Sequence, residues 1–485
     1  MRLHIAAVVA LAGLSACGTT VPTALQATAP TSDGFTVPST TPTSAPGQLP
    51  PGAVAGPGGQ APVVPGGGAT TAPLASLPVT SGNAPDHSPL SVGIITTNND
   101  AASGAGVDNG NTFTPRRAYT ALVAAWNARG GVAGSKIVPV YFELASSSGN
   151  VGTDLERACA TFTQDNHVGV VLGTTGFFDE AFTQCLARAR VPLVSSDYAL
   201  GDEQSLRAAS TLIAPSTLTT DARTSQLLQR FSGTKRLTSS SRLGVIVEGC
   251  AYTRRTYDRT VVPLAKQLGL TIAGHEETRC FHGLPDLGGQ AAELQGVVLR
   301  FQSSRVSDVL FVSGGMEGNL MLLFGAAAES QQYHPHYALT SGVSAVVQEG
   351  NTPGPQLQNA AGLGWLPDVD SDRTKVTRPE QVQCLGDLRR GGMSPTSPVD
   401  RTYGYDACDS LSLLAAALRV TSGSPAGLVG AVSSLGRSFT AATTYGGTTD
   451  FSAGRRTGPS TGRVFAWQSG CGCFDYTGPT FTLIP

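Results

Sequence analysis

Short apolar runs alternate with amphipathic segments along most of the chain, and this alternation constrains the fold more than any other feature. Apolar residues recur at helical spacing between the runs, as in Leu155, Ala158, Cys159 and Phe162. Strands separated by helices of this length predict a parallel sheet covered by helices on both faces. The first strand-like runs are "LSVGIITT" (90–97), "KIVPVYFEL" (136–144), "VGVVLG" (168–173) and "VPLVSS" (191–196).

A second series of the same kind begins after residue 241. Its strand-like runs lie at 242–248, 269–274, 307–314 and 336–342, with helical segments near 253–268, 289–301 and 319–330. Beyond it, the patterns predict helices at 378–390 and 406–420 and a strand at 463–468. The chain is therefore expected to form two α/β units in tandem, followed by a less regular part.

The stretch "NARGGVAGSKI" (127–137) joins a predicted helix to a predicted strand. Thr114 and Pro115 give this helix its start, because a capping residue precedes a proline in the first helical position. Gly130 and Gly131 can adopt the positive φ that ends a helix, and Gly134 allows a tight turn into the strand. We expect a compact helix-to-strand reversal here.

The composition is typical of a large globular protein with little net charge. Of the 485 residues, 40% are hydrophobic and 14% are charged, and the formal net charge is -2. Such a chain has no strong positive field to attract nucleic acid or an anionic lipid surface. We therefore expect no nucleic-acid partner.

The N-terminal sequence has the layout of an export signal. Arg2 precedes an apolar run from Ile5 to Leu14, which is too short to span a bilayer. The following "LSAC" resembles the bacterial lipoprotein signal, in which the cysteine becomes acylated after cleavage. We expect residues 1–16 to be a signal peptide and Cys17 to be the lipidation site; the alternative is an ordinary signal peptide followed by an unrelated cysteine.

Residues 17–87 are expected to form a lipidated cysteine followed by a disordered linker. Residues 18–87 contain 13 prolines and 11 glycines, and Asp33 and Asp86 are their only formal charges. Such a sequence has little apolar surface to bury in a core. The segment would act as a tether between the membrane and the folded part.

The eight remaining cysteines form an even set in a chain expected to be exported, which indicates disulfides. Eight cysteines allow 105 pairings, so chain order is the only guide to their partners. It favours the pairs Cys159–Cys185, Cys250–Cys280, Cys384–Cys408 and Cys471–Cys473, the last of which would close a very small ring.

Catalytic and metal-binding patterns are not found in the sequence. His275, Cys280 and His282 lie close together, but no C-x-x-C pair or H-E-x-x-H helix accompanies them. No lysine lies in a P-loop pattern, and no dinucleotide-binding spacing occurs. The stretch "GPSTG" (458–462) matches G-x-S-x-G, but it precedes a predicted strand and not a helix, so it is not a nucleophile elbow. We expect no enzymatic activity, no cofactor and no metal.

Several phrases together resemble the branched-chain amino acid and amide substrate-binding proteins of ABC importers, which have the type I periplasmic binding protein fold. The resemblance extends over about 390 residues from Leu90 onward. The phrases that carry it are "AWNARGGVAGSKIVPVYFE", "GVVLGTTGFFDEAFTQCLARARVPLVSSDYA", "LGVIVEGCAYTRRTYD", "SDVLFVSGG" and "YGYDACDSLSLLAAAL".

The resemblance implies an α/β fold of two lobes, each a mostly parallel sheet flanked by helices, joined by three crossover segments. We place these crossings near Ser216, Trp365 and Gly447. Lobe 1 would then comprise residues 88–217 and 366–447, and lobe 2 residues 218–365 and 448–485. A ligand would be held between the lobes, because loops after parallel strands present backbone N–H groups there.

The resemblance also points to particular ligand-binding residues. They lie in the loops that follow predicted strands, where one lobe would face the other. In lobe 1 they are Thr175, Gly176, Phe177, Ser196, Asp197 and Tyr198, and in lobe 2 they are Tyr252, Gly315, Met316 and Ser341. The alternative for each residue is an ordinary role in a loop or in packing.

The sequence departs from the family pattern at the expected ligand site. Phe177 and Phe178 replace serines that amino acid binders tend to have, and Asp197 replaces a small residue. A carboxylate there would repel an α-carboxylate but suit an amine, an amide or a hydroxyl-rich molecule. The ligand is therefore expected to be a small polar molecule with an apolar or cationic part.

The sequence taken as a whole predicts an extracytoplasmic solute-binding lipoprotein of an ABC importer. Its partners would be a small-molecule ligand, an ABC permease and the membrane through a lipid anchor, and we expect a monomer. The alternative is a ligand-sensing surface receptor on the same fold that is not coupled to transport.

Overall fold

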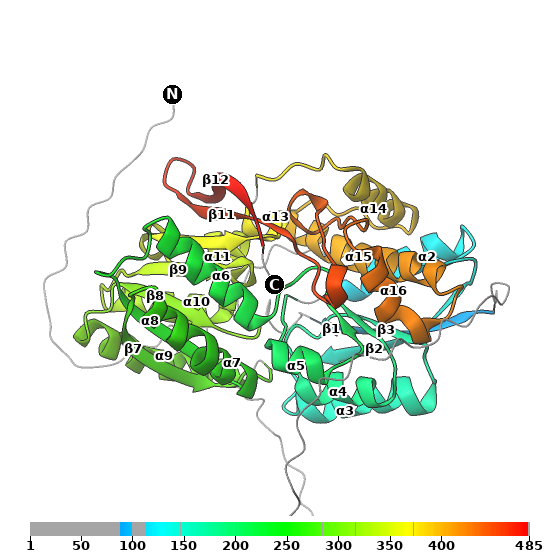
Figure 1. Ribbon diagram of the computed structural model, residues 1–485, viewed down its shortest axis with the longest axis horizontal. Helices are drawn as coiled ribbons and strands as arrows, with labels where there is room; N and C mark the ends of the chain where they lie inside the picture. The colour runs from blue at the N-terminus through cyan, green and yellow to red at the C-terminus, as the bar shows by residue number, and fades with distance from the viewer. Residues whose placement is uncertain are drawn as a thin grey trace, which may run out of the picture. The chain divides into compact units, whose positions relative to one another are not determined.

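The computed structural model describes residues 88–98, 113–145, 147–196, 198–283, 285–315, 317–371 and 373–483. These described residues all belong to one compact unit. The expected signal peptide, Cys17 and the linker therefore lie outside the described residues. Strands and helices alternate through most of the described part (Figure 1).

Two sheets organise the described residues. The strands are β1 (Leu90–Asn98), β2 (Ile137–Ala145), β3 (Val170–Gly173), β4 (Leu193–Ser195), β5 (Leu212–Ile213), β6 (Arg242–Gly249), β7 (Thr271–Arg279), β8 (Asp308–Val312), β9 (His336–Thr340), β10 (Ala360–Gly364), β11 (Thr461–Gln468) and β12 (Cys473–Thr482). The first five form one sheet and the other seven form the second. We call these sheets, with their helices, lobe one and lobe two.

Helices connect and cover the strands. The α-helices are α2 (Pro115–Asn127), α3 (Val151–Ala160), α4 (Glu180–Arg188), α5 (Glu203–Ala208), α6 (Thr220–Gly233), α7 (Ala251–Thr256), α8 (Val262–Gln267), α9 (Asp286–Ser303), α10 (Glu317–Ser330), α11 (Ala345–Asn351), α12 (Gly354–Leu357), α13 (Pro367–Asp370), α14 (Pro379–Arg390), α15 (Pro398–Val420) and α16 (Leu428–Leu435). Two π-helical turns, η2 (Thr161–Asp165) and η3 (Tyr257–Val261), continue α3 and α7.

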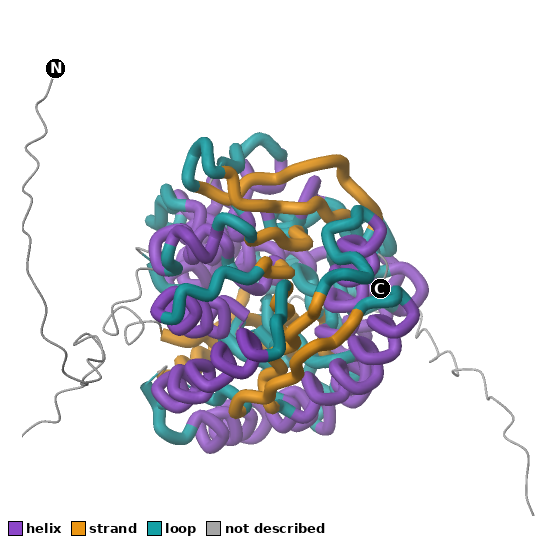
Figure 2. The backbone as a smooth tube through the Cα atoms, turned by 90° about the vertical axis from the view of Figure 1, so that its left-hand side faces the viewer, coloured by secondary structure: helices purple, strands orange, loops and turns teal. Residues whose placement is uncertain are grey.

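Both sheets have the same order in their parallel part. Lobe one runs β2-β1-β3-β4-β5, and lobe two runs β7-β6-β8-β9-β10 before the antiparallel strands β11 and β12 complete its edge. Figure 2 shows helices on both sides of most of the strands. This repeated order confirms the two tandem α/β units predicted from the sequence.

Alternate residues of each strand pack into different cores. Val170 and Leu172 face the helices α2, α14, α15 and α16, whereas Val171 faces the side covered by α3, α4 and α5. In lobe two, Val245 and Val247 pack in one core and Ile246 in the other. The central strands β3 and β8 are mostly apolar because both of their faces are buried, whereas the edge strand β7 is partly exposed and contains polar residues.

The helix-to-strand joint at residues 127–137 forms as expected. Thr114 caps α2 through its side chain, and Pro115 occupies the first turn. Gly130, Gly131 and Gly134 all have positive φ. A side chain at Gly131 would meet the carbonyl oxygen of Ser135 at 1.9 Å, so the reversal requires glycine there.

Helix α15 is longer than the sequence pattern indicated. We expected it from residue 406, but it begins at Pro398. Ser397 accepts a hydrogen bond from the amide of Asp400, and the proline lies in the first turn, which is a favourable helix start. The added turns read as loop in the sequence because they contain few apolar residues.

The three segments that we predicted as crossings meet around Trp365. This side chain is fully buried, and its indole N–H donates to the carbonyl of Ser216 at 3.1 Å. The carbonyl of Trp365 accepts from the amide of Tyr445 at 2.8 Å. Further along, Phe451 still packs in the lobe-one core. The lobe boundaries given above remain predictions.

Four disulfides are present in the described part of the chain: Cys159–Cys185, Cys250–Cys280, Cys384–Cys408 and Cys471–Cys473. These are the partners that chain order favoured. The first joins α3 to α4, and the third joins α14 to α15. Within the same residues, no helix combines the length and apolar character needed to cross a membrane.

Candidate functional site between the lobes

The strand order places a candidate ligand site at one end of each sheet. In a sheet of order 2-1-3-4-5, connections leave β1 and β3 toward opposite faces, and ligands bind outside the carboxyl ends of these two strands. The corresponding strands in lobe two are β6 and β8. The loops after these four strands therefore define the region where ligand-binding residues are expected.

The loop after β3 carries three predicted site residues. Gly176 has a φ of 78°, which allows the loop to reverse. The carbonyl of Thr175 accepts a hydrogen bond from the hydroxyl of Thr97 at 2.8 Å, and the hydroxyl of Thr175 donates to the carbonyl of Phe177. The ring of Phe177 meets Phe281 of lobe two edge-to-face, with centroids 6.5 Å apart. This loop thus reaches the opposite lobe.

The loop after β4 contributes Ser196 and Tyr198 in the described part, while Asp197 lies outside it. The hydroxyl of Ser196 is 3.1 Å from the hydroxyl of Tyr119, and its amide donates to the carbonyl of Gly173. The hydroxyl of Tyr198 donates to Asp406 at 3.2 Å. Both side chains thus make hydrogen bonds inside lobe one.

Lobe two contributes Tyr252 and Gly315, while Met316 lies outside the described residues. Tyr252 is buried in the first turn of α7. Gly315 has a φ of 142°, and a side chain there would lie 2.3 Å from the Cβ of Ala199 in lobe one. The absence of a side chain at Gly315 is therefore what allows the two lobes to approach here.

Ser341 directly follows β9, at the carboxyl end of this strand. Its hydroxyl donates to Asp370 at 3.0 Å and accepts from the amide of Trp365 at 2.9 Å. The residue is fully buried. The side chain of Ser341 therefore takes part in the hydrogen bonds around Trp365, and its role in ligand binding remains a prediction.

Aromatic side chains close the space between the strand ends. Phe178 and Tyr252 meet edge-to-face with centroids 5.2 Å apart, next to the contact between Phe177 and Phe281. Each of these four rings has less than a tenth of its surface exposed. Phe177 and Phe178 also line a small cavity inside lobe one, which has a volume of about 20 Å³. That is room for a water molecule but not for a solute.

An ion-pair cluster ties the lobes together beside the aromatic contacts. Arg255 of α7 donates to Asp202 at 2.7 Å and to Glu180 at 2.8 Å, and it also donates to the hydroxyl of Ser205. We call these four residues the Arg255 cluster. Burial alone would raise the pKa of Asp202, but hydrogen bonds from Arg255 and Ser205 bring it below the usual value. Asp202 therefore stays ionised at neutral pH.

A second, fully buried arginine links the same strand ends. Arg223 of α6 donates to the carbonyl of Tyr198 in lobe one at 3.1 Å and to the carbonyl of Ser313 in lobe two. Glu317 and Glu248 balance its charge. Burial raises the pKa of Glu317 to about 7, although Arg223 and Thr340 oppose this shift.

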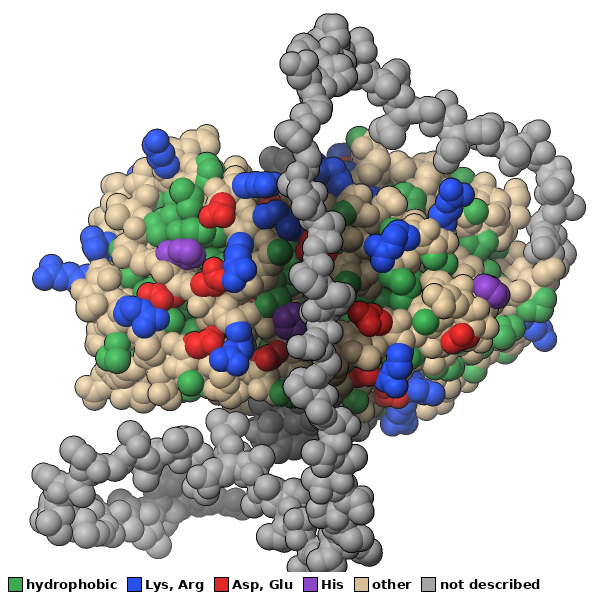
Figure 3. Space-filling model, turned by 90° about the horizontal axis from the view of Figure 1, so that it is seen from below, with side chains coloured by type: hydrophobic (Ala, Val, Ile, Leu, Met, Phe, Trp, Pro, Cys, Tyr) green, Lys and Arg blue, Asp and Glu red, His purple; other side chains and the backbone are tan. Residues whose placement is uncertain are grey.

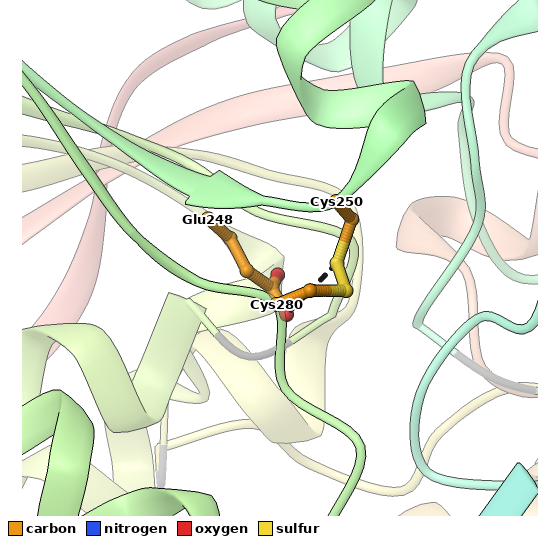
Figure 4. Close-up of side chains that lie close together, drawn as sticks. All are labelled: Glu248, Cys250 and Cys280. Carbon is orange, nitrogen blue, oxygen red and sulfur yellow. Dashed lines mark hydrogen bonds between the residues drawn. A yellow bond between two sulfur atoms is a disulfide. The ribbon is translucent and has the colours of Figure 1, made fainter.

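Glu248 supports the loops of lobe two. It accepts hydrogen bonds from the amides of Phe281 and Gly314 and from the hydroxyl of Ser313, at 2.9 to 3.1 Å. It lies beside the Cys250–Cys280 disulfide (Figure 4), with one carboxylate oxygen 3.6 Å from the sulfur of Cys250. Both sulfurs are bonded to each other, so neither is the thiolate that a metal would need.

A larger cavity lies elsewhere between the lobes. It has a volume of about 530 Å³ and lies between α5, the start of α6 and the segment 453–457. Charged residues of both signs line it, including Glu203, Asp221, Arg207 and Arg455. None of the predicted ligand-binding residues contributes to this cavity. Figure 3 likewise shows charges of both signs interspersed over the described part of the face in view.

The comparisons with known proteins give the class of fold. No protein-family model matches the chain, and no curated protein matches it by sequence. Solved structures match over most of its length. The chain has the two-lobe type I periplasmic binding protein fold, which confirms the fold that the resemblance implied.

The matching structures include three solute-binding proteins. A solute-binding protein of an ABC transporter from R. palustris, in complex with 4-hydroxybenzoate, has a TM-score of 0.59 and 15% identity, covering 82% of this chain and 98% of that one. A possible leucine/isoleucine/valine-binding protein from Rhodopirellula baltica has a TM-score of 0.59 and 14% identity, with coverage of 82% and 98%. A branched-chain amino acid transporter substrate-binding protein from Streptococcus pneumoniae, in complex with isoleucine, has a TM-score of 0.55 and 13% identity, with coverage of 82% and 100%.

Sequence reasoning missed several residues that join the lobes. Arg223, Arg255 and Phe281 were not among the predicted site residues. Arg223 follows the first predicted crossing directly, and an arginine in the first turn of such a helix is a signal that could have been used. Arg255 and Phe281 gave no comparable signal, because their partners are distant in the sequence.

Proposed function

We propose that this protein is the solute-binding component of an ABC importer, acting outside the cytoplasm. It would bind a small polar molecule between its lobes and deliver it to a permease. One observation carries the proposal: the strand ends where ligands bind in this sheet order oppose each other, with Gly315 against Ala199 and Phe178 against Tyr252. The fold of the matching solute-binding proteins supports the same role.

The closed contacts and a bound solute exclude each other at this site. Phe177 contacts Phe281 and Phe178 contacts Tyr252 across the strand ends, so a solute would enter there only after the lobes separate and the aromatic rings move apart. Its measured affinity would then be lowered by the fraction of molecules that are closed. We infer that the protein alternates between a closed form without solute and an open form that binds it.

The solute class we propose is an amino acid, an amide or an amine. Within this class the charge of Asp197 favours an amide or an amine, because its carboxylate would repel the α-carboxylate of an amino acid. The aromatic residues Phe177, Phe178 and Tyr252 support an apolar part in the ligand. The matching structures bind isoleucine and 4-hydroxybenzoate, which makes aromatic acids the comparison class in an experiment.

Thermal-shift measurements and calorimetry on the full chain test the proposal. The probes are branched-chain amino acids, amides, polyamines and 4-hydroxybenzoate. We expect one class to raise the melting temperature, because a ligand that binds only the folded state stabilises it. If no probe shifts the melting temperature of the protein or of its Arg255→Gln variant, in which the closed contacts are weakened, the solute-binding role is wrong.

We also propose that acylated Cys17 anchors the protein to the membrane, with residues 18–87 as its tether. One chain would supply only marginal attachment, at about 0.8 kcal/mol per buried CH₂, so several acyl chains are expected. Cys17→Ser should move the protein from the membrane fraction to the soluble fraction. An unchanged distribution would contradict lipidation at this residue.

A further inference from the structure

The turn between β11 and β12 contains a disulfide unlike the other three. Cys471 and Cys473 are 2 residues apart in sequence, whereas the partners in the other pairs are 26, 30 and 24 residues apart. Cys471 is exposed and Cys473 is buried. None of the six cysteines in the other bonds is exposed. One sulfur of this bond is thus directly accessible to a reagent in solution.

The hairpin does not depend on this bond for its shape. Trp467 pairs with Phe474 across the strands, and their rings meet edge-to-face at 5.3 Å. The amide of Gly472 donates to the carbonyl of Gln468 at 2.9 Å. A disulfide that closes so short a loop also removes little chain entropy from the unfolded state. Opening it should leave the hairpin folded.

A cation lies against the buried sulfur. Nε of Arg373 is 3.1 Å from Sγ of Cys473, and Arg373 comes from the segment after α13. Two acids also lie on or beside this strand: Glu349 accepts a hydrogen bond from the amide of Phe474 at 2.6 Å, and Asp475 accepts one from the amide of Tyr476 at 2.7 Å. A guanidinium beside a sulfur stabilises the thiolate that forms when a disulfide opens. The two ends of the bond are therefore unequal: Cys471 is open to attack, and Cys473 is the better leaving group.

We propose that Cys471–Cys473 is a redox-active disulfide that exchanges with low-molecular-weight thiols, with Cys471 as the attacked sulfur. A thiolate from solution forms a bond to Sγ of Cys471, the Cys471–Cys473 bond breaks, and its electron pair leaves on Cys473 beside Arg373. A second thiolate then attacks the sulfur of the bound thiol and releases Cys471 as a thiolate. In total, two thiols are oxidised to one small disulfide, and the protein disulfide is reduced to a dithiol.

Timed reduction of the full chain with glutathione tests this assignment. The reaction is quenched by alkylation, and peptides are identified by mass spectrometry. We expect Cys471–Cys473 to open at least about tenfold faster than the other three bonds, and the transient glutathione adduct to lie on Cys471. If another bond opens first, or if the adduct lies on Cys473, the assignment is overturned.

Three variants separate the role of Arg373 from a general effect of charge. Arg373→Gln should slow opening about threefold, because the departing thiolate loses its cation, and Arg373→Lys should restore most of the rate. Arg389→Gln is the control, since Arg389 is an exposed cation on α14, away from the hairpin. Circular dichroism establishes that each variant is folded. An equal rate in Arg373→Gln and Arg389→Gln would overturn the role of Arg373.

Discussion

The lobes touch in two regions that are built differently. Around the crossings, Trp365 is fully buried. Its indole N–H donates a hydrogen bond to the carbonyl of Ser216, and its own carbonyl accepts one from the amide of Tyr445. At the strand ends, the contacts are the ring pair of Phe178 with Tyr252 and the Arg255 cluster. In the first region the polypeptide backbone itself passes from one lobe to the other, whereas in the second region only side chains are in contact, and these can separate. This contrast teaches that the crossings hold the lobes together while the strand ends decide how far apart they lie.

The largest effect should come from the crossings. Trp365→Ala removes a fully buried indole and its hydrogen bond to Ser216, and we expect it to lower the free energy of unfolding by about 3–5 kcal/mol. Urea denaturation measures this loss. The matched control is Trp467→Ala, because Trp467 lies half-buried in the β11–β12 hairpin. If both variants lose the same stability, the crossings are not the more tightly built region.

The second effect is a pH dependence that originates near the crossings. Burial raises the pKa of Asp370 to about 7, although it accepts hydrogen bonds from Tyr476, Ser341 and the amide of Leu366. The folded protein therefore binds a proton more tightly than the unfolded chain does. The protonated carboxyl of Asp370 therefore stabilises the folded state at acidic pH. This contribution to the free energy of unfolding falls by about 3 kcal/mol as pH rises from about 4 to about 7.

Asp370→Asn tests this dependence. The variant cannot titrate at this position, so its free energy of unfolding should fall less between pH 5 and pH 8 than that of the original chain. Asp258→Asn, at an exposed position of η3, serves as the control and should leave the slope unchanged. Equal slopes in all three proteins would show that Asp370 does not carry the effect. A pH dependence of the same sign should remain in Asp370→Asn, because burial also raises the pKa of Glu317 to about 7.

The parallel sheets could be predicted because strands buried on both faces read as apolar runs, as at 168–173 and 242–248. β5 is only two residues long, Leu212–Ile213, and gives no pattern. β10 has the sequence "AAGLG", without β-branched residues, and β12 contains glycine and proline. Tertiary pairing rather than local preference forms these three strands.

The candidate site was predictable only to the level of its loops. Strand order fixes which loops lie at the carboxyl ends, so the segments around Thr175 and Gly315 could be located from sequence. Which side chain meets the other lobe depends on how the lobes are placed across the crossings. The sequence does not contain that information locally, and for this reason Arg255 was not expected between the lobes.

The third prediction concerns the Arg255 cluster and sharpens the comparison. Arg255→Gln leaves Asp202 and Glu180 without their cation, which should weaken the closed form by about 1–3 kcal/mol. We expect a larger radius of gyration by small-angle X-ray scattering and up to about tenfold tighter solute binding, since more molecules are open. Arg254→Gln is the matched control: it also breaks an ion pair on α7, but with Glu277 inside lobe two. A similar change in both variants would contradict a specific interlobe role.

Acid should weaken the Arg255 cluster in the same direction. The pKa of Asp202 lies below its usual value, so the stabilisation it provides is present above about pH 4 and is lost as pH falls through the lowered pKa. Scattering at decreasing pH should therefore show lobe separation only at strongly acidic pH, and Arg255→Gln should abolish that transition. A transition that persists in the variant would place its origin elsewhere.

The smallest effect should come from the ring pair at the strand ends. Phe178→Leu removes the edge-to-face contact with Tyr252, which contributes about 0.5–1.5 kcal/mol to the closed form. If the rings only close the gap, solute binding should become about threefold tighter, because less free energy is needed to open it. If Phe178 instead contacts bound solute, binding should weaken, and closure and solute binding would not be exclusive. Phe142→Leu breaks a comparable ring pair with Phe162 inside lobe one and should leave solute affinity unchanged, so calorimetry on the two variants distinguishes the alternatives.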